Sequence, residues 1–227
     1  MLKRATVLFA GAALALSLAA FQDRSVRPLP VLASEDFESG RADGWQPSDP
    51  AHWSVLPVGR NLVYALTAPG DQGKVRAPTS WSLWSGYEVG SFEFAGRLEC
   101  AADPANPKRD MCIIFGFQDP THFAYVHFAA SSDDVHNVIA VVNGADRARI
   151  STEAPGASAA RLTDKAWHAF KVTFDAATGE TKAYLDDMRV PVLTAVDRTF
   201  VRGRVGVGSF DDTGGFDDLT LRGVRIR

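Results

Sequence analysis

Histidine residues are concentrated in one short part of the sequence, which also contains Tyr125. Three of the five histidines fall between residues 122 and 136. Within His122–Ala129, the strand period of two places Phe123, Tyr125 and His127 on one face. An imidazole and a phenol two residues apart on one face can act as a general base and a general acid. This run therefore predicts a catalytic or binding surface on one side of a strand.

Two arginines near this run could complete such a site. Arg109 or Arg147 could bind an acidic group of a substrate. The alternatives are that His127 is a solvated or hydrogen-bonded structural residue, or that it binds a metal together with His136. The sequence indicates no third ligand for such a metal.

A second alternating run, residues 136–143, follows the first. If residues 131–135 form a hairpin loop, Asn137 and Ile139 lie on the same face as His127, and a slip of one residue would reverse this. The side chains of this patch that we expect to contact a substrate are Gln118, His122, Phe123, His136, Asn137 and Asn143.

Trp81 and Trp84 are further candidates for binding. Their rings could stack on the C–H faces of sugar rings, or they could fill an edge of the core.

The elements that must position these residues are short strands. About ten β-like runs between residues 53 and 225 are separated by Gly, Pro, Asn and Asp residues, with no helical period between them. This pattern is typical of an antiparallel β-sandwich or barrel. The chain has 227 residues and a hydrophobic content of 46%, which is enough for one sizeable core. Its net charge of −3 gives no basic field, so we expect no nucleic-acid partner.

The N-terminus has the composition of a secretory signal peptide. Lys3 and Arg4 precede an apolar run that ends at Ala20, and Ser17-Leu18-Ala19 fits a cleavage site. We therefore expect residues 1–20 to be removed, residues 21–34 to be a flexible lead-in, and residues 35–227 to form the domain. The mature protein would be exported to the periplasm or beyond, with no transmembrane segment. A retained N-terminal anchor is the alternative.

The two cysteines, Cys100 and Cys112, flank a polar stretch that contains proline. In an oxidising compartment they could form a disulfide that closes a hairpin loop, and two buried thiols are the alternative.

Three segments together resemble concanavalin A-like jelly-roll domains of the laminin-G and laminarinase-like superfamily, including 3-keto-disaccharide hydrolase-like members. They are the paired runs Trp167–Asp175 and Ala183–Asp187, the start Glu35–Gly40 and the end Gly203–Leu219. The resemblance implies an all-β, two-sheet antiparallel jelly roll over residues 35–225. It is specific for fold and weak for function, because this fold carries lectins, binding modules, hydrolases and lyases.

The resemblance has consequences for chemistry and for metal binding. Laminarinase-like hydrolases carry a Glu-x-Asp-x-x-Glu strand, but the nearest stretch here, Glu93–Glu99, has no Asp between its glutamates. Jelly-roll lyases use His, Tyr and Arg groups, which Tyr125 and His127 resemble. Many of these jelly rolls hold a structural Ca²⁺ where the first and last strands meet, and this implies Asp36, Glu38 and Asp217 as ligands.

The sequence therefore predicts an exported protein that binds a polysaccharide in a concave sheet groove. It would cleave the polysaccharide if His127 and Tyr125 act as an acid–base pair with Arg109 or Arg147. The alternatives are a noncatalytic lectin-like module and a laminin-G-type protein-interaction domain.

Overall fold

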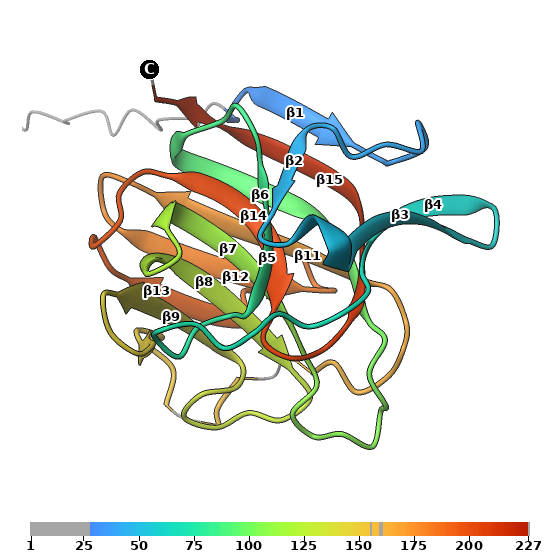
Figure 1. Cartoon of the computed structure of the whole chain (residues 1–227). Coiled ribbons are helices and arrows are strands. Elements are labelled where there is room, and N and C mark those ends of the chain that lie inside the picture. Colours follow the sequence, from blue (N-terminus) through green and yellow to red (C-terminus); the bar gives the residue numbers. More distant parts are fainter. Residues whose placement is uncertain (1–27, 155, 159–160, 227) are drawn as a thin grey trace, which may run out of the picture.

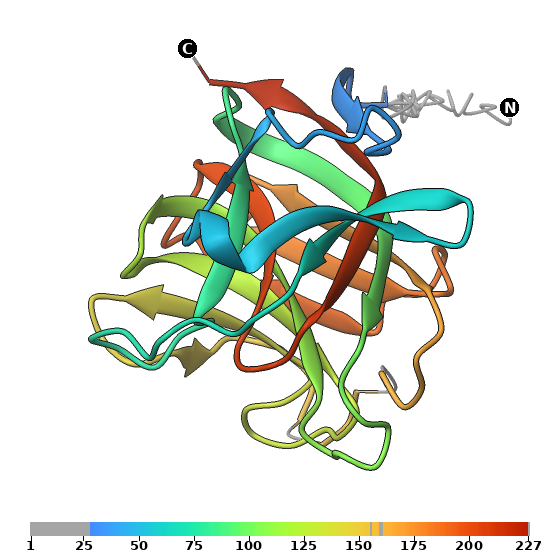
Figure 2. The same ribbon diagram turned by 45° about the vertical axis from the view of Figure 1, so that its right-hand side comes forward.

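The computed structural model describes residues 28–154, 156–158 and 161–226, which form two antiparallel β-sheets packed face to face (Figures 1 and 2). The predicted signal peptide and residues 21–27 of the predicted lead-in lie outside the described residues. Within the described part of the chain, no helix is both long and apolar enough to span a membrane.

Sheet A has the strand order β13-β12-β11-β6-β15-β4-β3, and β1 also pairs with β15. Its longest strands are β6 and β15, which lie side by side at its centre. The bounds are β1 (Val31–Glu35), β3 (Trp53–Val58), β4 (Asn61–Leu66), β6 (Val89–Cys100), β11 (His168–Asp175), β12 (Glu180–Leu185), β13 (Leu193–Val196) and β15 (Gly214–Arg225).

Sheet B has the order β10-β9-β8-β7-β14-β5-β2. It contains both alternating runs singled out in the sequence, as β8 and β9. The bounds are β2 (Trp45–Pro47), β5 (Ser80–Trp84), β7 (Asp110–Asp119), β8 (His122–Ala129), β9 (Val138–Asn143), β10 (Ala148–Arg149) and β14 (Arg204–Ser209), and one 3₁₀ turn, η1 (Pro50–His52), precedes β3.

The main core lies between the two sheets and is rich in aromatic side chains. Trp45 and Trp84 stack with ring centroids 4.9 Å apart, and Trp53 lies 4.8 Å from Tyr64. Phe94 of β6 packs edge-on against Phe170 of β11 at 5.5 Å. Aromatic pairs of this kind bury a large area and prefer tilted or offset geometry.

A second hydrophobic cluster lies on the opposite, outer face of sheet B. Ile113 and Val126 belong to the core between the sheets, and their neighbours in the chain, Ile114 and Tyr125, belong to the second cluster. Since successive side chains of a strand point to opposite faces, sheet B is buried on both sides over β7 and β8. The second cluster contains Ala77, Leu83, Cys112, Ile114, Phe117, Phe123, Tyr125, Val138, Ala140, Val142 and Phe210.

A β-bulge at Gly116 redirects the end of β7. Phe117 pairs with Arg204 and Ile114 with Gly206, so β7 carries one residue more than β14 between these pairs. Gly116 has φ +59°, and a Cβ there would lie 2.9 Å from Cβ of Phe200. The extra residue moves Phe117 from the inner face to the outer face, where it joins the second cluster.

The fold prediction is confirmed, and an observed strand overlaps each of the ten predicted runs. One boundary differs, because residues 31–34 of the predicted lead-in form β1 together with Glu35, and β1 pairs with Leu219–Arg222 of β15. Sequence reasoning also missed the short strands β2, β5, β10 and β13.

Candidate functional site

The predicted groove face is closed at its centre. Phe123, Tyr125 and His127 do share the outer face of sheet B, but their exposures are 0%, 0% and 2%. We call residues 67–79, between β4 and β5, the strap. Its Val75 and Ala77 pack into the second cluster, and the teal strap passes across sheet B in Figure 1.

Backbone hydrogen bonds hold the strap to the loop that follows β9. The amide of Arg147 donates to the carbonyl of Arg76 at 3.0 Å, and the amide of Arg76 donates to Oδ1 of Asp146 at 2.7 Å. The guanidinium groups of Arg76 and Arg147 lie 5.1 and 4.4 Å from the ring centre of Phe210. The strap and the loop after β9 therefore cover the centre of this face, so a polysaccharide chain cannot lie across it.

The predicted acid–base pair lies beneath this cover. Burial raises the pKa of Tyr125 far above its usual value of 10, so its hydroxyl stays protonated at neutral pH. Nδ1 of His127 lies 2.8 Å from the carbonyl oxygen of Val135, and its Nε2 lies 3.1 Å from Oδ2 of Asp110. This arrangement corresponds to the alternative in which His127 is a buried, partnered residue.

The two predicted arginines lie on different sides of sheet B. Arg147 is half-buried on the outer face beside Phe210 and lies near Tyr125, as predicted. Arg109 is fully buried and donates a hydrogen bond to the carbonyl of Cys100, a residue of the main core. Asp110 lies beside His127 on the outer face, and successive side chains of a strand point to opposite faces. Arg109, the residue before Asp110, therefore lies on the other side, and its predicted grouping with Tyr125 and His127 was wrong.

The predicted register between β8 and β9 was wrong by one residue. His127 pairs with Val138 and Tyr125 pairs with Ala140, so Ile139 faces the main core. Asn137 has φ +52°, and its side-chain amide bonds to the backbone of Ala129 and Ser131. Asn137 is therefore a buried structural residue and does not line a groove.

Three other predicted contact residues lie around the rim of this face. His122 is hydrogen-bonded to Asp119 at 2.9 Å, and His136 is hydrogen-bonded to Asp133 at 2.8 Å. Asn143 is exposed at the end of β9, opposite His122 in the ladder. The side chains of His122 and Asn143 are accessible, whereas that of His136 is only 13% exposed.

The two predicted tryptophans have different positions. Trp84 is 4% exposed and belongs to the main core. Trp81 is half-buried on the outer face, where its ring centre lies 4.8 Å from that of Phe117. Of the two, Trp81 can present part of its ring to a ligand.

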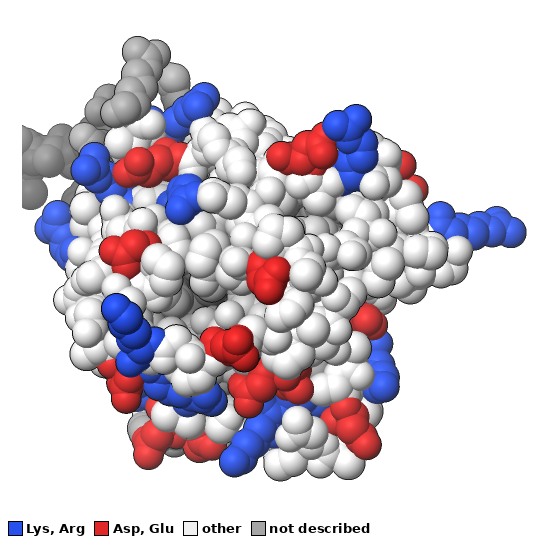
Figure 3. All heavy atoms as spheres, in the orientation of Figure 1, with Lys and Arg blue, Asp and Glu red and all other residues white. Residues whose placement is uncertain are grey.

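Two hollows flank the Trp81–Phe117 ring pair. The first, of about 410 Å³, lies between the strap and the β7–β8 turn, and it is lined by Asp71, Gly73, Lys74, Val75, Ala77, Pro78, Thr79, Trp81, Pro120 and Thr121. The second, of about 330 Å³, is lined by Gly86, Tyr87, Glu88, Phe117, Gln118, Arg204, Arg225 and Ile226. The molecular face in Figure 3 is hollowed near its centre, and acidic side chains lie close to this hollow.

Sequence reasoning missed the strap and the redirection of Phe117. The strap is polar and irregular in sequence, so no periodicity marks it. The glycine at position 116 was the one available signal for a bulge.

The predicted disulfide is absent from the structure, in which Cys100 and Cys112 are both free thiols. Cys100 packs in the main core between the sheets, whereas Cys112 packs in the second cluster on the outer face of sheet B. The two side chains therefore lie in separate clusters, and the alternative of two buried thiols is the correct one.

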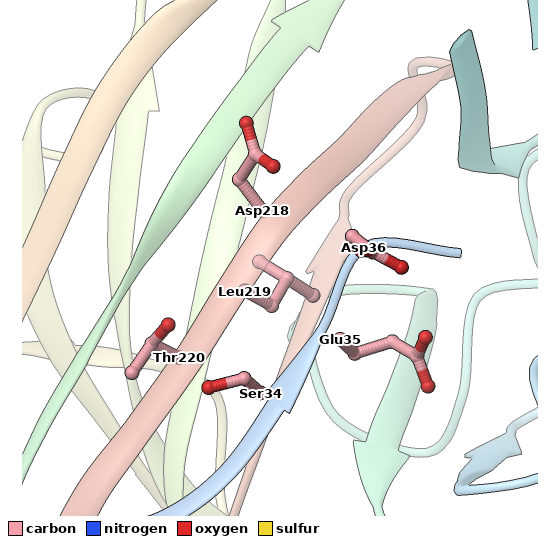
Figure 4. Close-up of a pocket in the computed structure, with 6 residues that line it drawn as sticks. All are labelled: Ser34, Glu35, Asp36, Asp218, Leu219 and Thr220. Atoms are coloured by element: carbon pink, nitrogen blue, oxygen red, sulfur yellow. The ribbon is translucent and has the colours of Figure 1, made fainter. Parts of the chain in front are cut away.

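The predicted calcium ligands are not gathered around one point. Asp217 accepts hydrogen bonds from Asn61 and from the amide of Asp218, and Glu38 accepts one from the amide of Leu62. A hollow of about 290 Å³ is lined by the paired end of β1 and the facing part of β15. In the view of this hollow in Figure 4, the carboxylate of Asp36 points away from that of Asp218.

Another group of potential metal ligands is present on sheet B. Among the described residues, the His, Cys, Asp and Glu side chains that bring three ligand atoms within 4.8 Å of one another are Asp110, Cys112 and His127, all buried. Burial acts to raise the pKa of Asp110, but the adjacent His127 and the amide of Phe210 outweigh it and lower this pKa. Burial raises the pKa of the Cys112 thiol well above its usual value.

Comparison with known proteins identifies the fold. No protein-family model matches the sequence, and no match was found among curated proteins. The structure is similar to the carbohydrate-binding module CBM66 from Bacillus subtilis, with a TM-score of 0.56 and 18% identity over 79% of this chain and 95% of that one. It is also similar to peanut lectin, with a TM-score of 0.52 and 14% identity over 86% of this chain and 98% of that one.

A third similar structure is the GH43 protein BlXynB from Bacillus licheniformis, with a TM-score of 0.55 and 10% identity. That match covers 84% of this chain and 39% of the other. At these identities the likeness concerns the fold alone. The protein has the two-sheet antiparallel jelly-roll fold of these structures.

Proposed function

We propose that this protein is a noncatalytic carbohydrate-binding domain whose ligand site is the hollow beside Trp81. The observation that carries the proposal is the half-buried Trp81 ring, which is supported from behind by Phe117 and borders a hollow of about 410 Å³. An aromatic ring with one free face, surrounded by a few polar groups, suits the apolar C–H face and the hydroxyl groups of a sugar.

The lining of this hollow provides both kinds of contact. Val75, Pro78 and Pro120 supply apolar walls, and Asp71 and Lys74 supply exposed charged groups. A carboxylate accepts hydrogen bonds from sugar hydroxyls, and an ammonium group donates to them. Polysaccharide cleavage by His127 and Tyr125 is not part of the proposal, because both side chains are buried under the strap and Phe210.

The proposal is tested by titrating a panel of neutral and acidic polysaccharides into the protein and its Trp81→Ala variant. Loss of the stacking contact should weaken binding by about tenfold or more, which corresponds to ~1.4 kcal/mol. Trp167→Ala is the matched control, because Trp167 is also half-buried but packs beside Gly215 of sheet A. Equal binding by the wild type and Trp81→Ala would refute this site.

The same panel addresses two alternatives. Release of reducing ends or of unsaturated products would contradict the noncatalytic proposal. Absence of binding to every glycan would favour the laminin-G-type interaction domain, an alternative that the closed centre of sheet B supports.

Two further predictions concern the whole chain. We propose that the protein is exported after cleavage near Ala19 or Ala20, and N-terminal sequencing of protein recovered outside the cytoplasm tests this. A structural Ca²⁺ at Asp36, Glu38 and Asp217 stays a prediction, although the ligand atoms of these three carboxylates do not all lie within 4.8 Å of one another. A higher Tm in Ca²⁺ than in EDTA would support it.

A further inference from the structure

Two neighbouring strands bring three different ligand types together on the outer face of sheet B. Asp110 and Cys112 are two residues apart on β7, and His127 of β8 is directly opposite Cys112. Oδ2 of Asp110 lies 3.1 Å from Nε2 of His127 and 3.5 Å from Sγ of Cys112. All three side chains are buried.

The hydrogen bond at the other ring nitrogen fixes the state of His127. Nδ1 lies 2.8 Å from the carbonyl oxygen of Val135, which can only accept a hydrogen bond, so Nδ1 carries a proton. When Nε2 carries no proton, its lone pair faces the carboxylate of Asp110, and a cation held between the two atoms would offset their repulsion. This Nε2 is buried and is not aligned for a hydrogen bond with any described group.

This arrangement is the one found around metal-binding histidines. A ligating imidazole donates its other N–H to a carbonyl or carboxylate, which fixes the tautomer and directs the free nitrogen at the metal. The Asp110 carboxylate is fixed in the same manner, because it accepts from the hydroxyl of Ser209 at 3.2 Å and from the amide of Phe210 at 3.1 Å.

We propose that Asp110, Cys112 and His127 bind a divalent transition-metal ion, with Zn²⁺ as the best-suited ion. One nitrogen, one oxygen and one sulfur ligand suit Zn²⁺ and Co²⁺, whereas Ca²⁺ and Mg²⁺ prefer oxygen ligands alone. On binding, the Cys112 S–H bond breaks, its proton passes to solvent, and the sulfur binds as thiolate. Sulfur keeps its oxidation state, so no redox partner is needed.

The site would be structural, because its ligands join separate parts of sheet B beneath the strap. It joins β7 to β8 directly, and it joins both to Phe210, at the end of β14, through the hydrogen bonds of Asp110. Since the ligands are buried, we expect the ion to enter during folding. The inference does not depend on carbohydrate binding, because Trp81 lines a separate hollow.

The test is to unfold the full chain in EDTA and refold it with Co²⁺ or Zn²⁺. We expect one metal per chain, a cysteine-thiolate-to-cobalt charge-transfer band in the near ultraviolet, and a higher Tm with Zn²⁺ than with EDTA. Cys112→Ala should lose the band and the rise in Tm, and Cys100→Ala, which removes the thiol outside the site, should keep both.

His127→Gln serves as the second ligand variant if Cys112→Ala does not fold. It should keep the thiol but lose most of the bound metal. The proposal is overturned if the refolded wild type holds far less than one metal per chain and gives no thiolate band. It is also overturned if Cys112→Ala or His127→Gln binds cobalt as well as the wild type does.

Discussion

Cys112 of β7 and His127 of β8 are paired across the ladder of sheet B, and both side chains are buried on the face that points away from the other sheet. A sandwich sheet normally buries one face and exposes the other. Here the strap, Phe210 and Arg147 cover the second face, so β7 and β8 are enclosed on both sides. The covered centre of this face therefore belongs to the core, and the open margin near Trp81 is the part left for the proposed ligand site.

The covered face should behave energetically as core. Phe123 is 0% exposed and packs against Phe117 and Tyr125. Phe123→Ala should lower the free energy of unfolding by about 3–5 kcal/mol, measured by urea denaturation. Thr173→Ala on the half-exposed outer side of sheet A is the control and should stay within about 0.5 kcal/mol of wild type. A loss below about 1 kcal/mol for Phe123→Ala would show that the face is open in solution.

The two thiols should be unreactive until the protein unfolds. Cys100 and Cys112 are free and are 1% and 0% exposed. A thiol reagent such as Ellman's reagent should therefore find no reactive cysteine in the native protein and two per chain in denaturant. Dithiothreitol should leave Tm unchanged. A lower Tm in dithiothreitol would indicate that the protein contains a disulfide, contrary to the structure.

Strand positions could be predicted because alternation and turn residues are local signals. Those signals place β8 and β9 correctly. The pairing of β8 with β9 was not predictable, because it depends on the left-handed conformation of Asn137. The cover over Tyr125 was not predictable either, because the strap is distant from β8 in sequence and meets it through long-range contacts. Of the candidate residues, Trp81 keeps its predicted role as a proposal, while His127 and Tyr125 are buried.

Asn137 should be essential for the β8–β9 register. Its side chain accepts from the amide of Ala129 at 2.8 Å and donates to the carbonyl of Ser131 at 2.7 Å, while its backbone has φ +52°. Asn137→Ala loses these bonds and strains the backbone, so we expect it to cost about 2–4 kcal/mol. Asn137→Gly loses the bonds but tolerates the conformation, so it should cost about 1 kcal/mol less than the alanine variant.

The control for Asn137 is Asn143→Ala at the exposed end of the same strand, which should change stability by less than about 0.5 kcal/mol. Chemical denaturation of all three variants gives the comparison. Equal stability of Asn137→Ala and wild type would mean that the register does not depend on this side chain.

Tyr64 should make the protein less stable at high pH. Its hydroxyl is hydrogen-bonded to Ser82 at 2.9 Å, and burial raises its pKa from 10.0 to about 12. The folded state therefore holds the phenol proton more tightly than the unfolded state does. This stabilisation is complete below pH 10 and is lost as the pH rises from 10 to 12, by on the order of 2 kcal/mol. Tyr64→Phe removes the titrating group, so its stability should fall less steeply over the same range when unfolding is followed by urea titration at each pH. Parallel stability curves for the variant and the wild type would contradict the raised pKa, because lysine and cysteine titrations contribute equally to both.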